Sequence, residues 1–105
     1  MDELDRRSQA HDKAAKELNE LKVKVRGARA RYLLAKAKRK LELHAKRVPD
    51  IILAATVEDD FSRPPLDAIL REYTLALGDK DIKEVEVQRL RDNYWDFKED
   101  MRRGI

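Results

Sequence analysis

The sequence predicts an all-α fold, and three observations predict it. Along residues 13–47 apolar side chains recur in alternating steps of three and four, the spacing of a helix that packs against other helices. This stretch has no proline and a single glycine, Gly27. Charged residues make up 43% and hydrophobic residues 42% of the 105 residues, a balance that suits narrow helix seams. We expect one domain, residues 1–105, with a long basic helix (13–47), a connector with a short helix (48–64) and a C-terminal helical segment (65–103) that packs back as a hairpin.

The first helix is strongly basic. Residues 13–47 hold thirteen Lys or Arg and three Glu, a net charge of +10, whereas residues 1–12 carry −2 and residues 48–105 carry −5. Its apolar seam consists of Ala14, Leu18, Leu21, Val25, Ala28, Tyr32 and Ala35. With Leu18 at heptad position a, two basic rows flank this seam: Lys22, Arg29 and Lys36 at e, and Lys24, Arg31 and Lys38 at g.

Beyond Tyr32 the apolar pattern of this helix rotates. It continues through Leu34, Ala37, Leu41, Ala45 and Val48, and is widened by Leu33 and Leu43. The pattern predicts either a helix that touches more than one neighbour or a deeper core around residues 32–43. Before the seam, residues 1–10 are polar and are expected to form a frayed first turn or two, since acidic residues suit a helix N-terminus.

Pro49 is expected to end the first helix, because a proline disfavours the α conformation of the residue before it. Residues 50–57 then predict a short buried helix with Pro49 at its first position, although Ile51 to Leu53 also fits a strand. An acidic loop follows, Glu58 to Asp60, and ends at Pro64 and Pro65.

The C-terminal segment is expected to begin with Pro65 in its first helical turn. One seam consists of Leu66, Ile69, Tyr73 and Ala76, and a second of Val87, Leu90, Tyr94, Phe97 and Met101, with Lys80 and Lys83 at the core positions between them. The segment is either one helix or two. We favour a turn or kink at Gly78, because Gly followed by Asp is poor helix chemistry.

The sequence offers little for catalysis. The chain has no cysteine, which excludes thiol chemistry and disulfides. His11 and His44 stand outside any metal-ligand spacing, and Glu58 to Asp60 lacks the ligand spacing and glycine of a calcium loop. We therefore expect no enzyme, no catalytic residue, no cofactor and no metal site. The longest apolar run, near Ile51, is far shorter than the roughly 20 residues of a membrane span, so we expect no membrane contact and a cytoplasmic location.

The basic rows predict a polyanion partner, because binding a phosphate backbone releases counterions and arginine adds forked donors. The alternative is that the e and g bases pair with acids of a neighbouring helix, such as Glu84, Glu86 and Asp100. Tyr32 could stack on an exposed base, but its seam position favours the core. The candidate nucleic-acid contacts are Lys22, Lys24, Arg26, Arg29, Arg31, Lys36, Lys38, Arg39 and Lys40.

The C-terminal seam predicts self-association, so we expect a homo-oligomer. Trp95 lies off the seam, so it either fills a subunit interface or is partly exposed; we favour the interface, because aromatic residues are enriched at buried interface centres. The candidate oligomerisation residues are Val87, Leu90, Tyr94, Trp95, Phe97 and Met101.

The stretch Ala28-Arg29-Ala30-Arg31-Tyr32 resembles the Ala-Arg-x-x-Tyr core of a motif in the recombination mediator protein of T4-type bacteriophages. The order of a basic helix, an acidic connector and an aromatic C-terminal segment is also similar. Gly27 stands where that family has a lysine before the alanine, and Arg31 where it has an acid. The resemblance implies a ring-like oligomer that binds single-stranded DNA and helps a RecA-type recombinase displace single-strand-binding protein, in the host cytoplasm if a phage encodes the chain.

The leading hypothesis is therefore a non-enzymatic DNA-binding accessory protein of phage recombination or replication. One alternative is a structural or scaffolding coiled coil that binds only protein. The other is a small adaptor or inhibitor that binds a host protein through its acidic half, residues 58–60 and 79–86.

Overall fold

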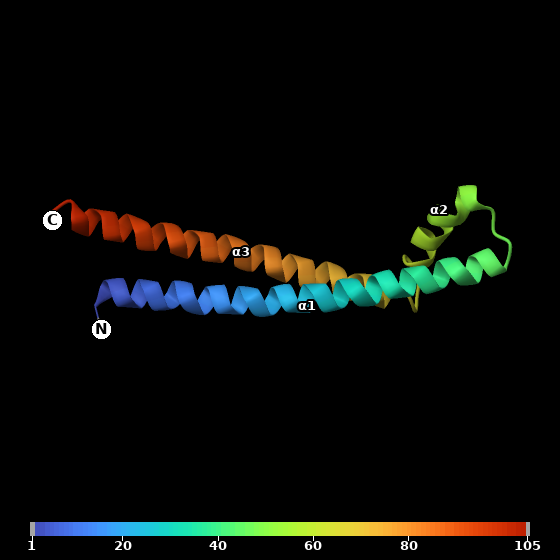
Figure 1. Ribbon diagram of the computed structural model, residues 1–105, viewed down its shortest axis with the longest axis horizontal. Coiled ribbons are helices and arrows are strands. Elements are labelled where there is room, and N and C mark those ends of the chain that lie inside the picture. Colours follow the sequence, from blue (N-terminus) through green and yellow to red (C-terminus); the bar gives the residue numbers. More distant parts are fainter. Residues whose placement is uncertain (1, 105) are drawn as a thin grey trace. The chain divides into compact units, whose positions relative to one another are not determined.

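The computed structural model describes residues 2–104, and these form three helices and no strand (Figure 1). Helix α1 spans Glu3–Ala45, α2 spans Asp50–Asp60 and α3 spans Asp67–Arg102. The described residues divide into two compact units: residues up to Val23 with those from Gly78 onward, and residues 24–77. We call them the terminal unit and the connector unit. In each unit a segment of α1 packs against a segment of α3, which confirms the all-α hairpin.

Helix α1 begins well before the basic stretch, at Glu3, so the expected first turns within residues 1–10 are helical. The Asp5 amide donates to Asp2 Oδ1 at 2.8 Å, and Arg7 donates to Glu3 at 2.9 Å. Such caps and acidic first turns stabilise a helix start. The helix ends two residues before the predicted Arg47. Arg47 has a φ of 63° and the Val48 amide donates to the Leu43 carbonyl at 3.1 Å, which is a Schellman termination ahead of a proline.

Helix α2 is longer than predicted and settles the choice between helix and strand for residues 51–53. Pro49 occupies the N-cap with extended backbone rather than the first helical position. The helix continues through Glu58 to Asp60, which were expected to form a loop. Val57 and Phe61 are almost fully buried. Together with Leu43 they form the core of the connector unit, against which these partly buried residues pack: Tyr32, Ala35, Val48, Leu53, Leu66, Ile69 and Leu70.

Helix α3 runs without interruption through Gly78, so the favoured break there is wrong. The glycine does not have a positive φ, and an added Cβ would have open space around it. One glycine in a helix interior costs only about 0.5–1 kcal/mol, and the seam is buried on both sides of it, at Ala76 and Val87. Pro65 precedes the helix instead of lying in its first turn.

The predicted seam of α1 faces the interior of both units. Of the rotated pattern beyond Tyr32, Val48 packs against the connector-unit core, but two leucines do not. Ala14 and Leu18 pack with Val87 in the core of the terminal unit, and Ala28 is buried in the connector unit. By contrast, Leu34 is 58% and Leu41 70% exposed. The deeper core around residues 32–43 is therefore limited to the buried seam and Leu43.

Tyr32 belongs to the core of the connector unit, as its seam position predicted. Its ring meets Phe61 edge-on, with the centroids 5.3 Å apart, and stacks with Tyr73 at 5.6 Å. Aromatic pairs at these separations stabilise one another beyond the area they bury. Because both neighbours hold the ring, Tyr32 is not available to stack on a nucleic-acid base.

Candidate nucleic-acid interface

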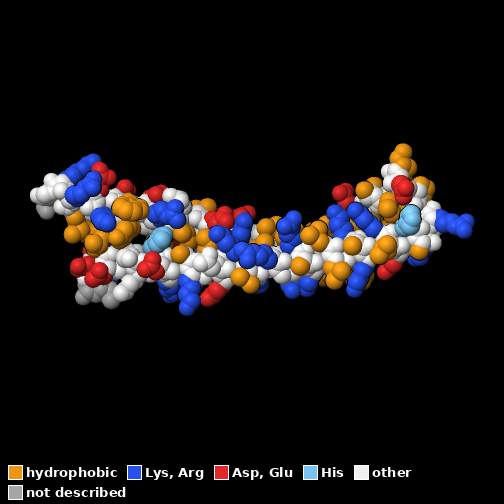
Figure 2. Space-filling view, viewed as in Figure 1, with side chains coloured by type: hydrophobic (Ala, Val, Ile, Leu, Met, Phe, Trp, Pro, Cys, Tyr) orange, Lys and Arg blue, Asp and Glu red, His pale blue; other side chains and the backbone are white. Residues whose placement is uncertain are grey.

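The bases of α1 are largely without carboxylate partners. Of the thirteen Lys and Arg in residues 13–47, only Arg31 and Arg39 lie within 4.0 Å of a carboxylate of the described chain. Figure 2 shows Lys and Arg side chains interspersed with apolar ones on the visible face. Unpaired bases on one helix repel each other at short range. A polyanion would relieve this repulsion.

Four of these unpaired bases form a row on one side of α1 in the connector unit, and we call it the basic row: Arg26, Arg29, Lys36 and Lys40. Their spacing of three, seven and four residues keeps them on one helix face, because three to four residues make a turn. At 1.5 Å per residue the row extends about 21 Å. Arg26, Arg29 and Lys40 are exposed. Lys36 is half-buried, with its ammonium 5.4 Å from the centroid of the Tyr32 ring.

The bases on the other side of the seam differ in exposure and in whether they pair with a carboxylate. Arg31 donates to Glu72 of α3, so its charge is already partly neutralised within the connector unit. Lys24 and Lys38 are exposed and have no carboxylate within 4.0 Å among residues 2–104. Lys22 is half-buried and belongs to the terminal unit.

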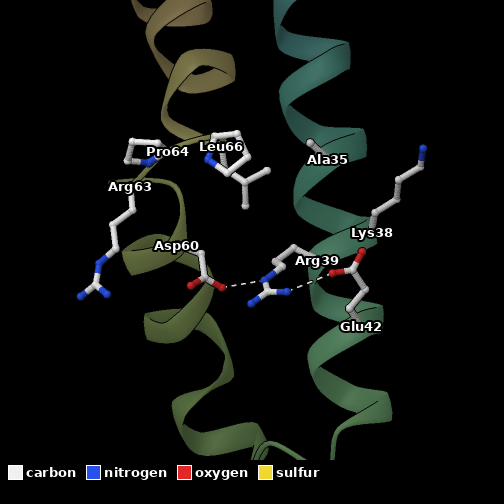
Figure 3. A pocket seen from close by; sticks show the side chains of 9 residues that line it. Ala35, Lys38, Arg39, Glu42, Asp60, Arg63, Pro64 and Leu66 are labelled. Carbon is white, nitrogen blue, oxygen red and sulfur yellow. Dashed lines mark hydrogen bonds and ion pairs between the residues drawn. The ribbon is translucent and has the colours of Figure 1, made fainter.

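Arg39 has a structural role in the connector unit (Figure 3). Its Nε donates to Asp60 at 2.7 Å and its Nη1 to Glu42 at 3.0 Å. These hydrogen bonds, to Asp60 first and Glu42 second, raise the pKa of the Arg39 guanidinium. Arg39 therefore joins α2 to α1. Because its side chain is 26% exposed and both of its hydrogen bonds go to carboxylates, it is less available to a phosphate than the unpaired bases.

An open cleft of about 490 Å³ lies beside this ion-pair group. Ala35, Leu66 and the Pro64–Pro65 turn provide apolar lining, while Lys38 and Arg63 bring charge (Figure 3). Arg63 in turn lies 3.1 Å from Asp59. The carboxylates of Asp60 and Glu42 at this cleft both accept hydrogen bonds from Arg39.

Within residues 2–104 the alternative pairing of α1 bases with acids of the C-terminal segment occurs once, between Arg31 and Glu72, and not at the three acids that were expected. Glu84 lies 3.5 Å from Lys80 and Glu86 2.8 Å from Lys83, and Asp100 has no cation within 4.0 Å in the described part. A second pair joins the same two helices in the opposite sense, from Lys83 of α3 to Glu17 of α1. Pairing of the α1 bases with acids of another chain stays a prediction.

The candidate oligomerisation residues fall into two groups in the terminal unit. Val87 is 6% exposed and packs with Leu18, and Leu90 packs against them, so both already serve the internal core. Phe97 is half-buried under Arg7, whose guanidinium carbon is 4.3 Å from the ring centroid. Tyr94 is half-buried as well. Trp95 and Met101 are 55% and 53% exposed, so they alone present a large surface.

A second basic group, which the heptad pattern did not predict, lies on α3. Arg91, Lys98 and Arg102 lie four, three and seven residues from Trp95 and share its face of the helix. The spacing of Arg91, Trp95, Lys98 and Arg102 indicates one shared helix face, whereas the heptad seam identifies only the apolar residues of the other face.

The described residues contain no group of three metal-ligating side chains. His44 is exposed, 3.9 Å from Asp50. His11 is half-buried: its Nδ1 lies 3.5 Å from Asp12, and its Nε2 is buried without a hydrogen-bond partner. None of the helices in residues 2–104 has the length and apolar character to cross a membrane.

No protein-family model, curated protein or solved structure matches this chain. The resemblance to the phage recombination mediators therefore stays a sequence-based hypothesis, and the residues themselves are the basis for a functional assignment.

Proposed function

We propose that this protein is a non-enzymatic accessory protein that binds single-stranded DNA through α1 and assists the loading of a recombinase. The observation that supports it is the absence of carboxylate partners for the basic row within residues 2–104. A surface row of cations held on a rigid helix matches a line of phosphates better than it matches a protein, whose acids alternate with bases.

The binding free energy would come mainly from counterion release. For a single strand, each phosphate contact contributes about −0.7 to the slope of log affinity against log salt, so the four residues of the basic row contribute about −2.8. Between 50 and 200 mM salt this slope lowers the affinity by roughly 50-fold. Arg26 and Arg29 each present a guanidinium fork that can hold two oxygens of one phosphate.

Fluorescence anisotropy of a labelled single-stranded oligonucleotide tests the proposal. We expect the quadruple variant Arg26→Ala, Arg29→Ala, Lys36→Ala, Lys40→Ala to bind more weakly and with a shallower salt slope than the wild type. The matched control removes four other bases: Arg6→Ala, Arg63→Ala, Arg71→Ala and Arg89→Ala. Both variants change the net charge from +3 to −1. Equal losses in the two would show that only net charge matters, and no binding at 50 mM salt would refute the proposal.

The recombinase-loading step rests on the resemblance of residues 28–32 to the mediator motif. It is tested by coating a single strand with single-strand-binding protein and measuring how fast a RecA-type recombinase forms filaments. We expect this protein to speed filament formation and the quadruple variant to do so less. Binding to DNA without any effect on the filament would leave a DNA-binding protein of another role.

A structural, self-associating protein is the second candidate, and one observation favours it. The outward face of α1 in the connector unit carries exposed leucines: Leu33, Leu34 and Leu41 are 48%, 58% and 70% exposed. A second copy of the chain would cover them. Sedimentation of the wild type and of Leu34→Gln, Leu41→Gln tests this, with a lower mass expected for the variant.

The adaptor alternative has less support, because most acids of residues 58–60 and 79–86 are already paired with Lys or Arg side chains of the same chain. Five acids of residues 58–60 and 79–86 lie within 4.0 Å of a Lys or Arg of the described chain, namely Asp59, Asp60, Asp81, Glu84 and Glu86. Such pairs lower the local negative field that a basic partner would meet.

A further inference from the structure

Trp95 stands apart from the other aromatic residues of the chain. Phe61 is buried, and Tyr32, Tyr73, Tyr94 and Phe97 are half-buried, whereas Trp95 is 55% exposed. The ring of Tyr94 meets it edge-on, with the centroids 5.6 Å apart and the planes at 76°. Because Tyr94 is itself half-buried, it supports the indole from one side. The indole is therefore held by Tyr94 on one side and open to solvent on the other.

Three cations lie on the same helix face as this ring. The Lys98 ammonium is 5.0 Å from the centroid of the Trp95 ring and 5.9 Å from that of Tyr94. Arg91 precedes Trp95 by one helical turn, and Arg102 follows Lys98 by another. None of the three lies within 4.0 Å of a carboxylate in residues 2–104. Lys98 and Arg102 line a hollow of about 190 Å³ beside Trp95.

One acid also lines this hollow, Glu99, and it is occupied by Arg103, whose Nη2 donates to it at 3.1 Å. The hollow therefore combines an aromatic face with free positive charge. Sites that hold single-stranded nucleic acid without sequence preference have this composition, because every base has a π-face to stack and every phosphate is negative.

We propose that Trp95 is a stacking platform for an unpaired base of single-stranded DNA, with Arg91, Lys98 and Arg102 contacting the adjacent phosphates. The base takes the place of the Lys98 ammonium on the indole face, and Lys98 moves to a phosphate. The inference rests on the proposed function and adds a second contact, in the terminal unit, that selects unpaired strands. A duplex keeps its bases stacked inside the helix and offers the indole no free face.

The chain has a single tryptophan, so its intrinsic emission reports on Trp95 alone. Titration with oligo(dT) is expected to quench this emission at the same concentrations that raise the anisotropy of the labelled strand. A blunt duplex of equal length is expected to bind without comparable quenching. Binding of the single strand with unchanged emission would overturn the stacking proposal and leave the proposed function standing. No binding of the single strand at all would overturn both.

Substitutions provide the second measurement. Removal of one stacked base–aromatic contact lowers affinity roughly 5- to 160-fold, so we expect a loss in this range for Trp95→Ala and a smaller one for Trp95→Phe. Met101→Ala, equally exposed on another face of α3, is the control and should keep wild-type affinity. An unchanged affinity of Trp95→Ala would contradict the proposal. A second copy covering Trp95 would also contradict it; in that case the emission shifts with protein concentration without DNA, and Trp95→Ala lowers the sedimentation mass.

Discussion

The Lys83 ammonium of α3 donates to Glu17 of α1 at 2.8 Å and to Glu86 at the same distance. Lys83 occupies a core position of the heptad, between Ala76 and Val87, and its side chain is 19% exposed. Lys83 can therefore occupy a seam position between packed helices, because its ammonium is hydrogen-bonded to two carboxylates. This pair fixes which face of each helix is turned to the other in the terminal unit.

This pair predicts a pH dependence of stability. The hydrogen bond from Lys83 lowers the pKa of Glu17 below its ordinary value of 4.5, so the folded state binds the proton less readily than the unfolded state. The contribution to stability is present above about pH 4.5 and is lost as the pH falls through the lowered pKa. We expect Glu17→Gln to melt at a lower temperature than the wild type at pH 7, with the difference shrinking at pH 3.

The same pair acts in the opposite direction at high pH. Hydrogen bonds to Glu17 and Glu86 raise the pKa of Lys83 above its ordinary 10.5, so its contribution is present below that value and is lost as the pH rises through the raised pKa.

Melting temperatures measured from pH 3 to pH 7 test the loss of stability at low pH. Glu20→Gln, which changes an exposed acid of the same helix, is the control and should melt like the wild type. If Glu17→Gln has the same melting temperatures as the wild type over this range, the stabilising role of the Lys83–Glu17 pair is contradicted.

Phe61 is expected to be the most sensitive core position of the connector unit. It is 1% exposed and contacts Tyr32 edge-on, so Phe61→Ala should lower the free energy of unfolding by about 3–5 kcal/mol. Urea denaturation followed by circular dichroism measures this loss. The control Ile51→Ala changes a side chain that is 92% exposed and should cost far less. Similar urea midpoints for the two variants would argue against this core.

Gly78 offers a substitution that should stabilise the protein. Since α3 continues through it and an added Cβ meets no atom within 4 Å, Gly78→Ala should raise the free energy of unfolding by about 0.5–1 kcal/mol. Thermal denaturation gives the measurement. Destabilisation by Ala would indicate that the helix is interrupted there.

The sequence predicted well which face of each helix is buried, because a heptad seam of apolar residues indicates the side that packs against another helix. Ala14, Leu18 and Ala28 are all buried as expected. It could not decide the fate of Leu34 and Leu41, since an apolar residue follows the same pattern whether its partner is in the chain or outside it. The local penalty of Gly78 was outweighed by the continuous seam around it. The pairing of Arg39 with Asp60 depends on how α2 docks, which no local pattern encodes.

The sequence predicted the positive charge of the candidate site but not which of its bases have carboxylate partners. The excess of bases in residues 13–47 was visible in the composition, but their division into paired and unpaired residues required the positions of Glu72, Asp60 and Glu42. Trp95 was singled out from the sequence, yet its exposure depends on the packing of the seam beside it.

Arg39 and Lys40 are neighbours in sequence and should respond in opposite ways to substitution. Lys40→Ala removes an exposed, unpaired cation, so it should make the slope of log affinity against log salt shallower by about 0.7 for single-stranded DNA and leave the urea midpoint unchanged. Arg39→Ala removes the hydrogen bonds to Asp60 and Glu42, so it should lower the urea midpoint and change the salt slope little. Arg39→Lys should recover only part of the stability, because an ammonium lacks the planar fork that reaches both carboxylates.

Anisotropy at four salt concentrations and urea titrations on the same preparations separate the two roles. A loss of salt slope in Arg39→Ala equal to that in Lys40→Ala would place Arg39 on the DNA and contradict its assignment as a link between α1 and α2.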